Sequence, residues 1–479
     1  MKRDQWSVTL NLALRLGLKH LQEMDVRPVA AFASLETLRQ RLGRALSDEG
    51  LPPDQVIDEL VRDADGGILG STCGRFFGWV IGGTLPAALA ADWLVSTWDQ
   101  NAAIHACGPA EAVIEEIAGN WLKELFGLPA TASFAFVSGT QMAHVTCLGA
   151  ARHRLLMRAG WDVEEKGLFG APAIRVVSSS ERHGSIERAL RVLGLGKSSV
   201  RILPCSQAGQ LDPSVLNQAF KEDAQPTIVI LQAGDLNIGA FDPFAELIPI
   251  AHEHGAWVHV DGAFGLWAAA SPRYRQQLRG VDLADSWTND GHKWLNTPFD
   301  CGYAFVADPQ AHRGAFSHRT SYTMYVDGAR DQIDWNPEWS RRGRAVPTYA
   351  ALRQLGRSGV AELVDRSCAH AHALVTRIGA LPGAAVVWEP TINQGLVRFL
   401  DRRAGATDAD HDRRTDDVIA RICATGEAFF GGTTWRGQRC MRVSVCNWQT
   451  DTADVDRAVA VAGRVLGEFS ATGNGPDAS

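Results

Sequence analysis

One lysine stands in a sequence context that suits chemistry better than solvation. Lys293 lies between His292 and Trp294, in a run from Asp285 that is otherwise poor in cations. A lysine is costly to bury without a partner, so it is either paired in the core or kept for reaction. The reactive alternative is a nucleophile that forms a Schiff base with a carbonyl compound. This run alone leaves both alternatives open.

A carboxylate closes the apolar run Trp257–Val260. Asp261 follows this predicted strand, and open α/β sheets bind ligands at the carboxyl ends of their strands. It could act as a metal ligand, a general base, or the partner of a protonated pyridine nitrogen. His252 and His254 lie two apart on a predicted helix, so they do not share a face. We therefore expect no metal.

A small polar turn follows the predicted strand Phe134–Val137. Gly139, Thr140 and Gln141 open a helix there, and backbone N–H groups at such a helix start bind phosphate. Turns between strands and helices are also rich in small polar residues merely because the chain must turn. The turn is therefore a candidate phosphate site only in combination with other features.

Two other segments carry weaker signals. His183 follows the predicted strand Ile174–Ser178 and could stack on a flat ligand, or serve as a structural hydrogen-bonding residue. The run Gly194–Ser198 looks like half of a nucleotide-binding P-loop. Its required first glycine is replaced by Arg191, and it follows a helix rather than a strand. We do not interpret it as a P-loop.

The predicted elements indicate an α/β fold. An N-terminal part is mostly helical, and β-rich runs then alternate with helices, which is typical of a mainly parallel sheet. A small α+β part follows, with strands at Gly395–Leu400 and Met441–Val445. Gly405–Asp416 is predicted as a surface loop and Ser470–Ser479 as disordered. The predicted parts are residues 1–108, 109–355 and 356–470, with a tail at 471–479.

The composition bounds the class of protein. The 479 residues are 46% hydrophobic and 21% charged, typical of a globular protein, and the net charge is −7. A mildly acidic chain does not favour nucleic acid as a partner, and no run of about 18 apolar residues predicts a membrane span. The nine cysteines are scattered without a CxxC pair. We therefore expect reduced thiols and a cytoplasmic protein.

Taken in chain order, these features resemble a known family. The sequence is similar to the group II pyridoxal 5′-phosphate (PLP)-dependent amino-acid decarboxylases, which include aromatic amino-acid and glutamate decarboxylases. The resemblance runs from about Arg75 to about Leu466. It implies PLP fold type I and resembles in particular bacterial members of uncertain substrate. The motifs that carry it are His259-Val260-Asp261, His292-Lys293-Trp294, Gly239-Ala240-Phe241-Asp242-Pro243 and Phe299-Asp300-Cys301-Gly302.

The resemblance implies a role for each cofactor-binding residue. Lys293 would bind PLP covalently, and an ionised Asp261 would pair with the pyridine nitrogen and keep it protonated. The ring then withdraws electrons from the carbon that loses CO₂. The other implied contacts are Ala263 and His183 on the two ring faces, Gly139, Thr140, Gln141 and His292 at the phosphate, and Asn237 near the 3′-oxygen.

The resemblance also implies residues that act on the substrate. Arg442 would bind the α-carboxylate through its two-pronged guanidinium, although it could be a surface strand arginine. Tyr322, in the loop Ser317–Arg330, would protonate the carbon that has lost CO₂, and Tyr325 is its rival. A Phe at this position in relatives accompanies oxidative aldehyde formation, so Tyr322 favours plain decarboxylation.

One N-terminal segment matches the substrate side-chain pocket of relatives. Phe77, Trp79 and Ile81 would line this pocket, or else form part of a hydrophobic core. An aromatic, apolar pocket suits an aromatic or medium apolar amino acid. Arg75 could instead serve an acidic side chain.

The sequence departs from the family pattern at three positions. Gly262 replaces an Ala, Gly291 stands where a Pro is common, and Asp290 stands where a neutral Asn often helps to hold the phosphate. A carboxylate at that place would repel phosphate, so we do not assign Asp290 as a phosphate ligand.

Decarboxylation of an L-amino acid to its amine is therefore the function we expect. The resemblance implies a homodimer with a shared active site, in which loops near Phe76–Thr84 meet at the interface. The alternatives are a PLP-dependent Cα–Cβ lyase, an aminotransferase, or a PLP-binding protein without turnover. We expect neither nucleic acid nor a membrane as partner.

Overall fold

The N-terminal hundred residues are helical, as the sequence predicts. The computed structural model describes residues 2–222, 225–318, 321 and 324–472. Ser34 caps one helix by accepting the Thr37 N–H, and proline opens two others where a missing N–H costs little. The helices are α1 (Lys2–Gln22), α2 (Leu35–Leu42), α3 (Pro53–Ala64) and α4 (Pro86–Trp98).

A seven-stranded sheet forms the centre of the α/β part, in the order β1-β7-β6-β5-β4-β2-β3. Only β7 runs against the other strands, so the mainly parallel sheet is confirmed. The carboxyl ends of the other six strands therefore share one edge. The strands are β1 (Ser133–Val137), β2 (Arg175–Ser179), β3 (Val200–Leu203), β4 (Thr227–Gln232), β5 (Trp257–Asp261), β6 (Ser286–Asp290) and β7 (Gly302–Val306).

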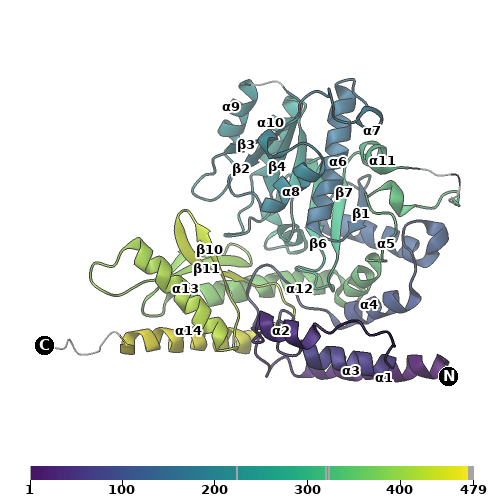
Figure 1. The fold of residues 1–479 in the computed structure, drawn as a ribbon. Helices are drawn as coiled ribbons and strands as arrows, with labels where there is room; N and C mark the ends of the chain where they lie inside the picture. Colours follow the sequence, from purple (N-terminus) through teal and green to yellow (C-terminus); the bar gives the residue numbers. More distant parts are fainter. Residues whose placement is uncertain (1, 223–224, 319–320, 322–323, 473–479) are drawn as a thin grey trace.

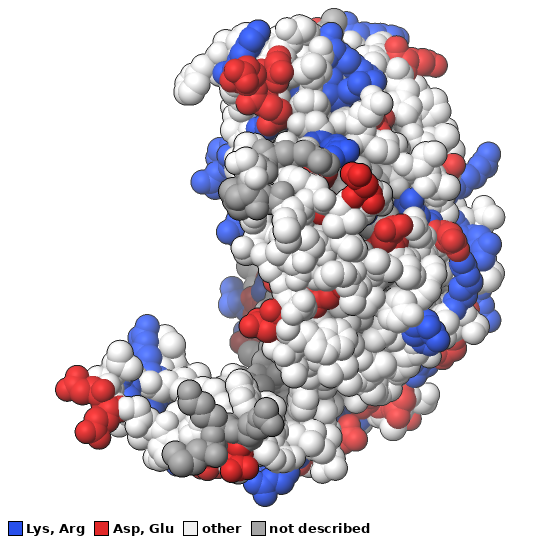
Figure 2. Space-filling view, turned by 90° about the vertical axis from the view of Figure 1, so that its right-hand side faces the viewer, with Lys and Arg blue, Asp and Glu red and all other residues white. Residues whose placement is uncertain are grey.

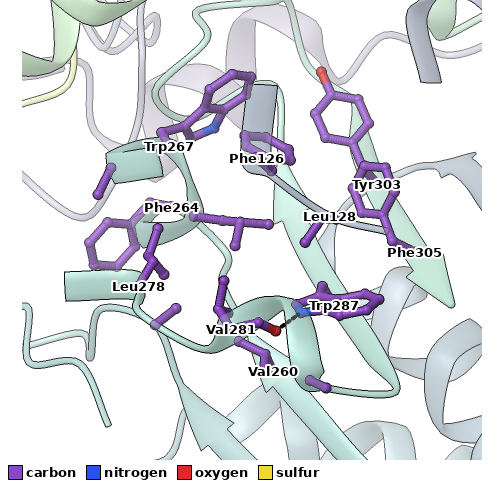
Figure 3. Packing of buried hydrophobic residues seen from close by; sticks show 14 of the residues in the cluster. Phe126, Leu128, Val260, Phe264, Trp267, Leu278, Val281, Trp287, Tyr303 and Phe305 are labelled. Atoms are coloured by element: carbon purple, nitrogen blue, oxygen red, sulfur yellow. Dashed lines mark hydrogen bonds between the residues drawn. The ribbon is translucent and has the colours of Figure 1, made fainter. Parts of the chain in front are cut away.

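The sheet is covered on both faces. Phe134 and Phe136 of β1 belong to one hydrophobic cluster, whereas Ala135 and Val137 belong to another, as strand alternation requires. Figure 3 shows part of the first cluster, where the Trp287 indole N–H donates to a main-chain carbonyl. The accompanying helices are α5 (Pro109–Phe126), α6 (Thr140–Arg158), α7 (Val163–Lys166), α8 (Gly184–Val192), α9 (Pro213–Lys221), α10 (Phe244–Glu253) and α11 (Pro309–Phe316).

A second, antiparallel sheet forms near the C-terminus, in the order β10-β11-β9-β8. The long helix α12 precedes it and lies below the large sheet (Figure 1). The domain boundaries given above stay a prediction. The elements are α12 (Ala345–Gly379), β8 (Ala384–Trp388), β9 (Gln394–Phe399), α13 (Asp408–Ala424), β10 (Gly431–Trp435), β11 (Gln438–Ser444) and α14 (Thr452–Thr472).

Two predictions about this C-terminal part are wrong. The predicted loop Gly405–Asp416 is helical from Asp408, because Thr407 and Asp410 form a reciprocal capping box. The predicted disordered tail begins too early, since α14 continues to Thr472. Residues 473–479 lie outside the described residues.

The molecule has a concave side. The space-filling view shows a lower lobe, which contains the N-terminal helices at the lower right of Figure 1, projecting from the main body (Figure 2). Basic and acidic side chains are interspersed on the visible face, with wide uncharged areas between them. Within the described residues, no helix combines the length and the apolar character that crossing a bilayer requires.

Candidate active site

A cavity opens at the edge where the parallel strands end. The turns after β1, β2, β4, β5 and β6 all contribute to it, which is where open α/β sheets bind ligands. Eight of the predicted site residues line this cavity. They are Gly139, Thr140, Gln141, His183, Asp261, Ala263, His292 and Lys293.

Lys293 is paired with Asp290 inside this cavity. Its Nζ lies 3.1 Å from Asp290 Oδ2, and its side chain is 21% exposed. The Thr140 N–H at the start of α6 donates to Asp290 Oδ1 over 2.6 Å. Burial raises the pKa of Asp290, but the charge of Lys293, together with His292 and the hydrogen bond from Thr140, outweighs it and holds this pKa below its usual value. An ionised carboxylate therefore occupies the helix start that the sequence predicts for phosphate.

Asp261 ends β5 as a buried carboxylate. Burial alone would raise its pKa, but contact with His144 and the nearby His183 and Lys293 lower the pKa well below its usual value. His144 Nε2 lies 3.5 Å from Asp261 Oδ2, and the Ala263 N–H donates to Oδ1 over 3.2 Å. Asp261 is thus ionised and faces the cavity, as a partner for a protonated ring nitrogen must be.

Two histidines border the cavity in the neutral form. His183 Nδ1 accepts the Ser185 N–H over 3.2 Å, which caps α8 and fixes the ring. Burial lowers the pKa of His183, and Lys293 lowers it further. Burial also lowers the pKa of His292, whose Nδ1 accepts the Cys301 N–H over 3.1 Å. Both rings are therefore available for stacking or hydrogen bonding without charge.

Arg442 and Asn237 lie beside the cavity but do not line it. Arg442 Nη1 donates to the Leu236 carbonyl over 3.1 Å, and Leu236 does line the cavity. Burial lowers the pKa of Arg442 to about 10, so it stays cationic at neutral pH. The Asn237 Oδ1 accepts the Thr433 hydroxyl over 2.8 Å, which engages this amide outside the cavity.

The three residues predicted for the side-chain pocket do not line the cavity of their own chain. Phe77 is fully buried in the C-terminal core against Phe430, and Trp79 is 52% exposed. Ile81 packs in a small separate cluster. None of the three lines the cavity, because Val80 is the residue of this segment that turns toward it.

Arg75 cannot serve a substrate carboxylate. Its side chain is buried, and its guanidinium donates to main-chain carbonyls of Gly426 and Glu427 and of the segment Met24–Arg27. This arginine holds the N-terminal segment against the C-terminal part of the chain.

The predicted proton donor Tyr322 lies outside the described residues. Its rival Tyr325 is described and half-buried. The choice between them stays a prediction.

Sequence reasoning missed several residues at this site. Val80, Gln232, Leu236 and Phe264 line the cavity, and His144 contacts Asp261 from α6. His144 follows Thr140 by four positions, so helical spacing could have placed it on the same face as the phosphate turn. The others carry no chemical signal in the sequence, because only the fold brings them to the cavity.

The fold is PLP fold type I. The structure is similar to a crystal structure of Oryza sativa TDC with PLP and tryptamine (TM-score 0.91, 24% identity, 97% and 98% of the two chains). It is also similar to mouse CSAD (TM-score 0.88, 22% identity, 97% and 98% of the chains).

The family follows from the sequence comparison. Residues 36–400 match the pyridoxal-dependent decarboxylase conserved domain, and the chain belongs to this family. An aromatic-L-amino-acid decarboxylase of Bacillus atrophaeus is 27% identical over 455 residues, 92% of each protein. The human acidic amino acid decarboxylase GADL1 is 29% identical over 364 residues, 74% of this chain and 69% of the relative. The protein is a PLP-dependent carboxy-lyase that decarboxylates an amino acid.

The cavity residues fit PLP. Among the described residues, the buried Thr140 Oγ1 and Gln232 Nε2 have no hydrogen-bond partner, and both residues border the cavity. Buried polar atoms of this kind are normally satisfied, so they suit a polar ligand. A lysine and an ionised carboxylate stand at the same cavity, as a Schiff base and a pyridinium ring require.

Proposed function

We propose that this enzyme decarboxylates an L-amino acid with an aromatic or medium apolar side chain to the corresponding amine. The observation that carries the proposal is the single cavity bordered by Lys293, Asp261 and Thr140. Its other walls include Val80, Leu236 and Phe264, which suit an apolar side chain.

Each residue has a proposed task. Lys293 holds PLP, Asp261 pairs with its ring nitrogen, and His183 and Ala263 contact its ring faces. When bound, PLP supplies an electron-withdrawing ring that stabilises the carbon losing CO₂. The other proposed contacts are Gly139, Thr140, Gln141 and His292 at the phosphate, and Asn237 at the 3′-oxygen.

Orientation of the substrate selects the bond that breaks. The Cα–carboxylate bond must stand perpendicular to the ring so that it overlaps the π system. Arg442 is the proposed anchor of that carboxylate, because it is a cation immediately behind the Leu236 wall. Tyr322 is the proposed donor of the proton that replaces CO₂.

We also propose a homodimer that works in the cytoplasm. Trp6, Leu10, Leu14 and Leu18 recur every four residues on α1 and are 70%, 53%, 40% and 46% exposed, an apolar stripe that a second copy could cover. The nine free cysteines suit a reducing compartment.

A product assay tests the proposed function. PLP-loaded protein is given a panel of aromatic, aliphatic and acidic L-amino acids, and CO₂ and amine are measured together. We expect equal amounts of CO₂ and amine from an aromatic or medium apolar substrate. Turnover of acidic substrates alone would contradict the proposed substrate class, and Lys293→Ala provides the inactive control.

A further inference from the structure

A row of buried polar side chains leads from Asp261 into the core: three hydrogen bonds link its members, and the last member, His144, contacts Asp261 at 3.5 Å without a hydrogen bond. The Trp257 indole N–H donates to Ser286 Oγ over 2.9 Å, and Ser286 Oγ lies 2.9 Å from His259 Nδ1. His259 Nε2 lies 3.0 Å from His144 Nδ1, and His144 Nε2 faces Asp261. We call Trp257, Ser286, His259 and His144 the relay.

The fold brings the relay together from three elements. Trp257, His259 and Asp261 alternate along β5, so their side chains lie on one face of the sheet. Ser286 pairs with His259 across to β6. His144 of α6 covers this face, with its ring edge-on to that of His259 at 5.2 Å. All four relay side chains are 2% exposed or less.

The hydrogen bonds of the relay have a direction. The Ser286 oxygen accepts from the indole, and its own hydrogen has His259 Nδ1 as an acceptor. Burial lowers the pKa of His259 well below its usual value, so this ring is neutral and donates once, from Nε2 to His144 Nδ1. His144 then carries its hydrogen on Nε2, which faces the Asp261 carboxylate.

We propose that the relay keeps Asp261 ionised and in position to pair with the cofactor's ring nitrogen. Each donor in it points toward Asp261, so their dipoles add and favour the ionised form of this buried carboxylate. The relay touches neither cofactor nor substrate and acts through Asp261. This inference rests on the proposed role of Asp261 as the partner of that nitrogen.

If the relay had a merely structural role, its loss would leave the site's preference for a ring nitrogen over a ring carbon unchanged. Fully buried polar side chains can serve only to satisfy one another in the core. In that case, loss of a relay member would lower stability without changing how the site distinguishes a ring nitrogen from a ring carbon. If the relay holds Asp261 ionised, that distinction must weaken.

The test compares binding of PLP with binding of 1-deaza-PLP, in which CH replaces the ring nitrogen. The ratio of the two dissociation constants measures the coupling between Asp261 and the nitrogen, without any turnover. We expect the wild type to prefer PLP, and His259→Phe to reduce this preference on the order of tenfold, as loss of an outer partner does at metal sites. His259→Gln, which keeps a donor near Nε2, should restore part of it.

A second variant and a matched control complete the test. Ser286→Ala removes the donor to His259 with little change in volume and should reduce the preference less than His259→Phe. His312→Phe removes another fully buried histidine, which is hydrogen-bonded to Ser133 and Trp335 outside the relay. This variant should keep the wild-type preference for PLP over 1-deaza-PLP.

The outcomes separate the inference from the proposed function. An unchanged preference in both His259→Phe and Ser286→Ala would overturn the relay. If Asp261→Ala also keeps the wild-type preference, Asp261 is not the partner of the nitrogen, and the proposed role fails instead.

Discussion

At the scale of single residues, the site brings one reactive cation and two carboxylates into one cavity. Asp261 is supported by His144, whereas Asp290 is paired with Lys293. The two carboxylates therefore differ in their surroundings, and we expect them to differ in function.

Lys293→Ala should remove covalent attachment of PLP. Treatment with borohydride fixes a Schiff base, so the wild-type protein should retain the cofactor's mass after denaturation and the variant should not. Mass spectrometry of the denatured protein makes the measurement. Lys197→Ala removes the exposed lysine of the run that looks like half of a P-loop and should leave attachment intact. Retention of the mass in Lys293→Ala would show that another residue binds PLP.

Asp290→Asn should bind a phosphorylated cofactor more tightly than the wild type. Nearby positive charge lowers the pKa of Asp290, so the carboxylate is charged at neutral pH and opposes a phosphate at the start of α6. A phosphate monoester gains its second charge as the pH rises through about 6. Wild-type affinity should therefore fall across that range.

Pyridoxine 5′-phosphate is a suitable probe of Asp290, because it cannot react with Lys293. Its dissociation constant, measured by calorimetry between pH 5 and 8, roughly the range in which phosphate gains charge, should change less in Asp290→Asn than in the wild type. A parallel pH dependence in both proteins would show that Asp290 does not oppose the phosphate.

Residue types and spacing, together with the family resemblance, predicted eight residues that line the cavity. Lysine, carboxylate and helix-start signals are local, so Lys293, Asp261 and Thr140 could be found without a structure. Phe77 and Val80 show the limit of this reasoning. The direction of a side chain in an irregular segment depends on packing against distant residues, and a local motif does not encode it.

At the scale of elements, Gly356 in α12 has a backbone conformation that other residues do not adopt easily. Gly356 has φ 63° and ψ 179°, and a Cβ there would meet no atom within 4 Å. Gly356→Ala should therefore destabilise the protein through the backbone alone, by about 1–3 kcal/mol. Thermal unfolding measures the change.

A matched substitution should have the opposite sign. Gly467 lies in α14, and a Cβ there would also meet nothing within 4 Å. Gly467→Ala should stabilise the protein by about 0.5–1 kcal/mol, because it reduces the freedom of the unfolded chain. If Gly356→Ala and Gly467→Ala changed the free energy of unfolding by the same amount and in the same direction, backbone conformation would not explain the effect.

One element that sequence patterns missed, β6, has no apolar periodicity. β6 reads Ser-Trp-Thr-Asn-Asp and is fully buried, yet polar residues make up most of it. Its polar groups find partners in β5 and in the turn after it, as when Asn289 Nδ2 donates to the Gly262 carbonyl over 2.8 Å. A buried polar strand at an active site cannot be distinguished from a loop by hydropathy. By contrast, β1 and β2, predicted at Phe134–Val137 and Ile174–Ser178, lie within one residue of those bounds.

At the scale of the whole molecule, the loop that contains Tyr322 is anchored far from the cavity of its own chain. Arg330 stacks on Phe134 at the start of β1, and Ser317 donates to Asp334 near the same end. His312 of α11, just before the loop, lies 2.8 Å from Ser133. The cavity opens at the other end of β1, about 13 Å along the strand.

This placement predicts which active-site residues come from different subunits. We expect Lys293 and Arg442 to act in one chain's site, and the loop, whose described anchors lie at the other end of β1, to act in the partner's cavity. Mixed dimers of Lys293→Ala and Tyr322→Phe should therefore regain amine formation, because one of their two sites combines an intact lysine with an intact loop. Because the mixed dimers are purified through both tags and have one complete site of two, about half of wild-type activity is expected.

Mixed dimers of Lys293→Ala and Arg442→Ala provide the comparison. Each subunit then lacks one residue of its own site, so mixing should restore nothing. Variants carrying different affinity tags are co-expressed, purified through both tags and assayed for amine. Recovery with Arg442→Ala but not with Tyr322→Phe would reverse the assignment, because the arginine would then reach across the interface while the loop stays with its own chain. Recovery with Tyr322→Phe alone would show that two chains complete each cavity.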